Sequence, residues 1–183
     1  MPTAAKVSAG KPKSGGAIYR AAAGTTLPTD ATTALSADFK ELGFVSEDGV
    51  TNNNSPDSDN IKAWGGQTVL IVKNEQVDEF SFTLIEALNS EVLTTVYGAS
   101  NVTVTGSTIA IKATADIIPA AVFVIDMALA GNYAKRIVIP AGSLSEVGEI
   151  VYKDDEPIGY EITIAALPDS TGVQHYEYIA PTA

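Results

Sequence analysis

The sequence predicts a mainly β protein, a two-sheet sandwich with one flanking α-helix, and three observations support this fold class. Several segments alternate apolar and polar residues with a period of two, as strands with one buried and one solvated face do. One further segment carries the start, stop and spacing signals of a helix. Hydrophobic residues make up 45% of the 183-residue chain, which is enough for a substantial core.

The clearest alternation lies in residues 78–85 and 158–165. The first segment would bury Phe80, Phe82 and Leu84 and leave Glu79, Ser81 and Thr83 on the solvated face. The second would leave Glu161 and Thr163 on its solvated face. Gly106 and Ser107 predict a type II′ turn between strands 102–105 and 108–112. Further strands are predicted at residues 39–45, 68–73, 121–127, 136–139 and 147–152, of which 121–127 is almost wholly apolar and therefore central.

The predicted helix covers the stretch NSEVLTTVYG. Asn89 is a favourable N-cap, Glu91 lies in the first turn, and Gly98 follows the last turn. One face of this helix is apolar and should pack on a sheet; it holds Val92, Leu93, Val96 and Tyr97.

A polar stretch at residues 46–67 interrupts the strand pattern. Because connections in compact domains are usually short, we expect residues 47–66 to form a long functional loop. Val50, Ile61 and Trp64, the only tryptophan, bracket its most polar part. Such apolar residues at a loop end anchor either on the parent domain or on a partner, and the sequence leaves both open.

The charges are distributed unevenly. Residues 1–16 are basic and polar and predict a flexible N-terminal arm, while residues 17–183 predict one domain. Residues 1–40 hold five basic and two acidic residues, whereas residues 41–183 hold six basic and twenty acidic residues. The net charge of −11 therefore comes from the domain, and a surface of this sign disfavours tight binding of nucleic acid.

No catalytic, metal or cofactor site is predicted. The chain lacks Cys, and its single histidine, His175, has no supporting pattern for a triad or a metal site. Residues 57–60 (DSDN) have calcium-ligand side chains, but Ile61 stands where an EF-hand loop requires a further ligand, and no Gly follows it. The carboxylates at 154–156 are typical of a solvated turn. The sequence contains neither a signal-peptide core nor an apolar run long enough to span a membrane.

Five segments, in their order and spacing, resemble the major tail proteins of long-tailed, non-contractile bacteriophages. They are GGAIYRAAAGTTLPTDATTAL (15–35), LGFVSEDGVT (42–51), IKAWGGQTV (61–69), FSFTLIEALNSEVLTTVYG (80–98) and KRIVIPAGSLSEVGEIVYKDDEPIGYEITIAALPD (135–169). The resemblance implies a tail-tube β-sandwich with a flanking helix. Six subunits would form a ring whose inner strands make one barrel, and stacked rings would form the conduit for the genome.

The resemblance also implies roles for particular residues. The loop would contact neighbouring subunits or rings through Glu47, Asp48, Val50, Asn52, Asp57, Asp59, Ile61 and Trp64. The arm would contact an acidic neighbour through Lys6, Lys11 and Lys13. The channel would be lined by Glu79, Ser81, Thr83, Glu161 and Thr163, whose acidic rings would let DNA slide without adhering.

The implied partners are further copies of the chain, the tail-tip or initiator protein, the tape-measure protein and the tail terminator. Double-stranded DNA would pass through without tight binding, and no membrane or cofactor is involved. The protein would be made in the host bacterial cytoplasm and function in the virion. Alternatives are a tail terminator, head–tail connector or head decoration protein, or a carbohydrate-binding β-sandwich that stacks Trp64 on a sugar. An enzyme is the least supported class, because no nucleophile–base pattern is present.

Overall fold

The computed structural model describes residues 3–13 and 16–182, and most of them lie in strands. The strands are β1 (Lys11–Pro12), β2 (Ile18–Ala22), β3 (Lys40–Glu41), β4 (Val45–Lys62), β5 (Thr68–Leu84), β6 (Val102–Thr105), β7 (Thr108–Ile111), β8 (Ala121–Leu129), β9 (Tyr133–Val147), β10 (Tyr160–Ala166) and β11 (Tyr176–Pro181). The helices are α1 (Ser90–Tyr97) and two 3-10 turns, η1 (Ala4–Lys6) and η2 (Ala99–Asn101). The prediction of a mainly β protein with one α-helix is confirmed.

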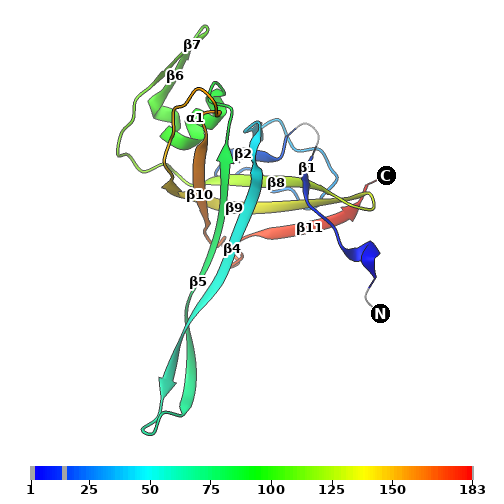
Figure 1. Ribbon diagram of the computed structural model, residues 1–183, viewed down its shortest axis with the longest axis vertical. Coiled ribbons are helices and arrows are strands. Elements are labelled where there is room, and N and C mark those ends of the chain that lie inside the picture. Colours follow the sequence, from blue (N-terminus) through cyan, green and yellow to red (C-terminus); the bar gives the residue numbers. More distant parts are fainter. Residues whose placement is uncertain (1–2, 14–15, 183) are drawn as a thin grey trace.

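Nine strands form one antiparallel sheet that folds over on itself at β9. The main order is β3-β2-β8-β9-β10-β5-β4, with β1 added beside β8 and β11 beside β9. The first half of β9 pairs with β11 and the second half pairs with β10. As a result, β4, β5 and β10 run along the long axis of the molecule, while β8, β9 and β11 cross them (Figure 1). The two layers enclose the core, as in a β-sandwich.

The main core lies between these layers and under α1. It is built from the alternating apolar residues of β5, β8 and β10 and from the apolar face of the helix: Phe80, Phe82, Leu84, Phe123, Ile125, Ile162, Ile164, Val92, Leu93 and Val96. The period-two prediction for β5 and β10 is confirmed, because each residue with the predicted inward phase is buried. The bulk of the molecule depends on this burial of apolar surface.

A second, smaller core covers the opposite face of β8. Val122 and Val124 alternate with the residues that enter the main core, so β8 is buried on both faces, as its apolar sequence predicts. Leu27, Leu35 and Phe39, from the segment that joins β2 to β3, cover this second core.

The local signals for the helix and for the short hairpin are also confirmed. The side chain of Asn89 accepts a hydrogen bond from the backbone N–H of Glu91 at 3.0 Å. Gly98 ends the helix with a φ of 90°, which favours glycine. Gly106 begins the β6–β7 turn with a φ of 61°, as a type II′ turn requires.

Two strand predictions and the loop prediction differ from the structure. Residues 39–45 form only the short β3 and the start of β4, because Gly43 adopts a φ of 72° between them. Of the predicted strand 147–152, only Val147 lies in a strand, at the end of β9. Residues 148–159 lie outside any strand, and their acidic residues and Pro157 disfavour a strand there. The expected loop at residues 47–66 is mostly strand, because β4 pairs with β5 as far as Lys62. Only the five residues 63–67 connect these two strands.

Candidate assembly surface

The distal part of β4 and β5 projects from the body of the protein as a two-stranded ribbon (Figure 1). We call residues 53–77 the hairpin arm and the neighbouring residues Asn52 and Asp78 its root. The strands of the arm pair with each other, and β4 lies at the edge of the sheet. Pro56 lies in this edge strand, where the loss of one backbone donor is tolerated.

Cross-strand side-chain bonds explain why such a polar sequence forms strands. Gln76 Nε2 donates to Asn54 Oδ1 at 2.8 Å, and Gln76 Oε1 in turn accepts a hydrogen bond from Lys73 Nζ. Asn52 Nδ2 donates to Asp78 Oδ1 at 2.8 Å. Side-chain pairs across antiparallel strands stabilise a ladder even when the intrinsic strand preference is low.

Exposed apolar residues are concentrated at the far end of the arm. Trp64 is fully exposed in the turn, which is closed by a hydrogen bond from Ala63 N–H to the carbonyl oxygen of Gln67 at 2.8 Å. Ile61 is paired with Leu70 and exposed beside it. Large apolar groups follow one another along this end of β5: Val69, Leu70, Ile71 and Val72. Because successive residues of a strand point to opposite faces, the arm is apolar on both sides, which is typical of an interaction surface.

The five residues predicted to line a channel lie together on one face of the sheet. The register places Glu161 opposite Thr83 and Thr163 opposite Ser81, and the hydroxyls of Ser81 and Thr163 are 2.9 Å apart. Glu79 continues the row on β5. Glu146 joins this face from β9, where it is paired with Thr163. We call this surface the acidic face; its charged residues at the paired positions of β5, β9 and β10 are the glutamates Glu79, Glu146 and Glu161.

The predicted loop residues occupy three different environments. Glu47 and Asp48 lie at the start of β4, and Val50 packs against the main core. Asn52 lies at the root of the arm and bonds to Asp78. The remaining four residues, Asp57, Asp59, Ile61 and Trp64, belong to the arm or its turn. Val50 therefore stabilises the body, whereas Asp59, Ile61 and Trp64 are exposed on the arm; the side chain of Asp57 lies outside the described part of the structure.

The N-terminal segment is partly attached to the body. Lys11 and Pro12 form β1, which pairs with β8, while Lys6 in η1 remains exposed. Lys13 Nζ lies 3.4 Å from Asp126 Oδ2 on β8. Of the three predicted contact lysines, Lys13 thus has an intramolecular partner.

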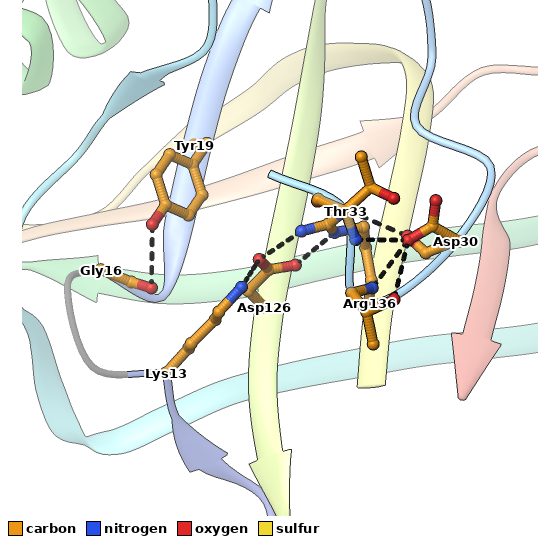
Figure 2. A network of polar contacts seen from close by, with 8 residues as sticks. Lys13, Gly16, Tyr19, Asp30, Thr33, Asp126 and Arg136 are labelled. Carbon is orange, nitrogen blue, oxygen red and sulfur yellow. Dashed lines mark hydrogen bonds and ion pairs between the residues drawn. The ribbon is translucent and has the colours of Figure 1, made fainter. Parts of the chain in front are cut away.

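A network around the buried pair Asp126 and Arg136 joins the N-terminal segment, through Lys13, to the segment between β2 and β3 that covers the second core (Figure 2). Arg136 Nε and Nη2 donate to the two carboxylate oxygens of Asp126 at 2.6 and 2.8 Å. Arg136 Nη1 also donates to the carbonyl oxygens of Asp30 and Thr33, at 3.0 and 2.9 Å. The hydrogen bonds to Asp126 raise the pKa of the Arg136 guanidinium, so the guanidinium remains charged. The network fastens the segment that covers the second core.

Asp30 organises the turn that Arg136 holds. Its Oδ1 accepts hydrogen bonds from the backbone N–H groups of Thr33 and Thr32, at 2.6 and 2.7 Å. These bonds lower the pKa of the Asp30 carboxyl from 3.8 to about 2, and the bond from Thr33 contributes most.

Sequence reasoning missed Asp78 and His175, which lie at the root of the arm. His175 Nδ1 is 2.5 Å from Asp78 Oδ2, although 97 residues separate them in the chain. Asp78 continues the inward phase of β5, where the period-two pattern predicts an apolar residue. The interruption of that pattern by a carboxylate was the one available signal, and it could not identify the partner.

Two observations bear on other kinds of site. Within residues 3–13 and 16–182, no group of three or more His, Asp or Glu residues is arranged to hold a metal ion. In the same described ranges, no helix has the length and apolar character needed to cross a membrane.

The fold and these surfaces define a class of protein: a β-sandwich with a projecting apolar arm and an acidic sheet face. Both features are typical of a protein that contacts other molecules extensively. Residues 11–183 match the family described as phage tail tube protein, and the chain belongs to this family. It is therefore a structural protein of the bacteriophage virion and a component of the tail. A search of curated proteins found no match.

Replacement of Arg136 by Leu should lower the free energy of unfolding by about 3–5 kcal/mol, because Asp126 would remain buried without its main counter-charge. Urea unfolding followed by circular dichroism measures this change. The double variant Asp126→Leu, Arg136→Leu removes both charges and should recover part of the loss. A loss below about 1 kcal/mol in the single variant would contradict the proposed role of the pair.

The variant Asp30→Asn should be less stable than the native protein only where the carboxylate is ionised. The pKa of Asp30 is lowered on folding, so its contribution is complete above the unfolded value of 3.8 and is lost as the pH falls towards about 2. Urea unfolding of both proteins at several pH values measures the difference, and Asp154→Asn controls for the loss of a surface charge. A difference that stays constant down to about pH 2 would contradict this account.

Proposed function

We propose that the chain polymerises as stacked hexameric rings into the tail tube of a long, non-contractile phage tail, the conduit for genome delivery. Membership of the phage tail tube family carries this proposal. The subunit is made in the host cytoplasm, assembles with the tail-tip, tape-measure and terminator proteins, and has no enzymatic activity. Residues 17–183 form the tube domain, and residues 1–16 act as an arm towards a neighbour.

The hairpin arm makes the main contact with a neighbouring ring. This assignment is supported by the two-sided exposure of its apolar end, where Leu70 is 54% and Ile71 65% exposed. An apolar surface of this kind gains free energy when a partner removes it from water, at about 25 cal/mol per Å². An isolated two-stranded ribbon is only marginally stable in water, so docking would also order the arm.

The edge of β4 supplies a lateral contact within a ring. An edge strand has backbone N–H and C=O groups that another chain can pair with. Pro56 and the neighbouring polar residues limit indiscriminate pairing along this edge, so that assembly depends on a specific neighbour.

The acidic face lines the channel. Glu79, Glu146 and Glu161 bring negative charge to one sheet face, and six-fold repetition would turn each residue into a ring of carboxylates. A channel of this sign repels phosphate, so DNA would slide through without adhering. Lys6 and Lys11, which are exposed on the N-terminal segment, fit an acidic surface on a neighbouring copy.

The geometry of the arm argues against the carbohydrate-binding alternative. Trp64 lies at the convex tip of a hairpin, whereas a sugar platform needs a concave surface with several polar groups. The cavity of about 920 Å³ between residues 10–13, Gly16, Ala17 and the start of β4 is lined by other residues than Trp64.

Concentrated native protein should form hollow tubes with six-fold end views in negative-stain electron microscopy. The variant Trp64→Ser, Leu70→Ser should remain folded but fail to form tubes, because it removes exposed apolar surface from the arm only. Its unfolding free energy should stay within about 0.5 kcal/mol of the native value. Leu88→Ser, at a highly exposed leucine outside the arm, is the control and should assemble.

Single closed rings instead of tubes would favour a terminator or connector role for the native protein. Normal tubes from the arm variant would show that the arm is not the contact between rings.

The variant Glu79→Lys, Glu161→Lys should assemble but slow the passage of DNA, because it replaces repulsion by attraction to phosphate. The measurement is the rate of DNA release from particles that carry the variant tube. Asp154→Lys, Asp155→Lys gives the same change of net charge on the exposed segment after β9 and serves as the control. Equal release rates in both variants would place the acidic face away from the channel.

A further inference from the structure

The root of the hairpin arm contains a buried carboxylate that neither core requires. Asp78 is only 3% exposed and occupies the position on β5 where the row of Phe80, Phe82 and Leu84 would continue. An apolar residue there would extend the main core, whereas a buried carboxylate costs free energy unless it is paired. The position of Asp78, where the strand leaves the body, therefore calls for an explanation.

Asp78 collects polar partners from two other parts of the chain. Asn52 Nδ2, on β4, donates to Asp78 Oδ1 at 2.8 Å and to the carbonyl oxygen of Glu79 at 3.1 Å. His175 Nδ1, just before β11, lies 2.5 Å from Asp78 Oδ2. Each carboxylate oxygen thus has one partner, and the two strands of the root are joined to the C-terminal part of the chain.

The C-terminal segment holds the root at further points. Gln174 Nε2 donates to the carbonyl oxygen of Gln76 at 3.0 Å. The imidazole of His175 is 16% exposed and packs edge-on against Phe80, with ring centroids 5.2 Å apart. Packing against Phe80, a core residue, restricts the position of the imidazole. Its bond to Asp78 therefore fixes the arm root relative to the body.

We propose that Asp78 and His175 form a clamp that fixes the direction in which the hairpin arm leaves the body, and that protonation of His175 tightens the clamp. His175 is in this sense a positioning residue, since it acts on the apolar tip through the arm root. The clamp itself is a property of the single subunit. Its consequence, that the arm is pre-set to meet a neighbouring ring, rests on the proposed function.

The charges around the imidazole give the direction of the pH effect. Asp78 faces Nδ1 from β5, and Glu177 Oε1 lies 4.0 Å from Nε2 on β11. Lys135 on β9 is bound to Glu177 at 2.7 Å and partly offsets that carboxylate. A neutral imidazole can donate one hydrogen bond to the Asp78 carboxylate, whereas the imidazolium adds the attraction between opposite charges. Protonation of the imidazole should therefore hold the arm more tightly.

The test measures the distance between the arm and the body in the dilute, unassembled protein. Spin labels are attached to Thr68→Cys near the tip and to Ala22→Cys on β2, both exposed sites in a chain without native cysteine. Double electron–electron resonance then gives the distribution of distances. We expect the distribution of the otherwise native protein to narrow between about pH 8 and about pH 5.

Two variants separate the clamp from general stability. His175→Gln keeps a neutral donor but cannot be charged, so the pH-dependent narrowing should be lost while the protein remains folded. Asp78→Asn removes the charge but keeps the shape, and should give a broad distribution at both pH values. Asp155→Asn, an exposed site on the segment after β9, is the matched control and should behave as the native protein does.

A narrow distribution in Asp78→Asn, or a pH response that persists in His175→Gln, would overturn the proposal. Tube formation by the same variants is scored separately by electron microscopy. If the native protein forms no tubes but the distance measurements behave as expected, the clamp stands and the proposed function fails. If tubes form but the distance distribution does not change with pH, the proposed function stands and the clamp fails.

Discussion

The antiparallel pairing of β4 with β5 is the interaction on which the rest of the molecule depends. Within the body, this ladder presents Phe80 and Phe82 to the core and Glu79 and Ser81 to the opposite face. Beyond Asp78, the same ladder continues without a third strand and becomes the arm. A slip of one residue in its register would exchange the two faces, and so would disturb the core, the acidic face and the arm together.

Irregularities in this ladder shape the arm. The register shifts between Val45 and Val50, between Asp57 and Ser58, and between Ile61 and Lys62. Such bulges increase the local twist of a ribbon, and the two strands of the arm twist about each other in Figure 1. Because of this twist, the apolar end of the arm is rotated relative to the sheet of the body. Its exposed side chains therefore point in several directions.

Local patterns in the sequence predicted the elements that local physics determines. Strict alternation identified the inward and outward residues of β5 and β10, and Asn89 and Gly98 identified the ends of the helix. The conformation of β4 was beyond such reasoning, because its Asn, Ser, Asp and Pro residues have low strand preference and pair only in the presence of β5. The bond between Asp78 and His175 joins residues 97 positions apart, and no spacing pattern in the sequence predicts it.

Membership of the acidic face was predictable in part. Alternation placed Glu79 and Glu161 on the solvated faces of their own strands, but the alignment of those strands depends on the register between β5 and β10. Glu146 joins them only because a bulge in the β9–β10 pairing sets its phase, and it was not a predicted site residue. The contact roles of these side chains and of the arm still rest on the proposed assembly.

The buried carboxylates Asp126 and Asp78 share one arrangement. Asp126 and Asp78 each lie on a strand next to a buried apolar row, and each is bound by a basic side chain from another element, Arg136 or His175. The Arg136 pair also fixes the segment between β2 and β3, which is not part of a regular ladder. Hydrophobic burial can hold such layers together without setting their direction, whereas a directional pair in a dry site specifies one arrangement.

The division of β9 between two partners also determines how the molecule responds to mechanical load. A pull along the axis of the arm acts along β5 and, through the adjacent ladder, on β10 and the second half of β9. The hydrogen bonds of the β5–β10 ladder lie across that direction, so they are sheared together and do not open one after another. From β9 the strain passes to β8 and β11, which run across the pull and spread it over the second layer. A subunit built in this way can bear a pulling force on the hairpin arm without its strand pairs opening one after another from that end.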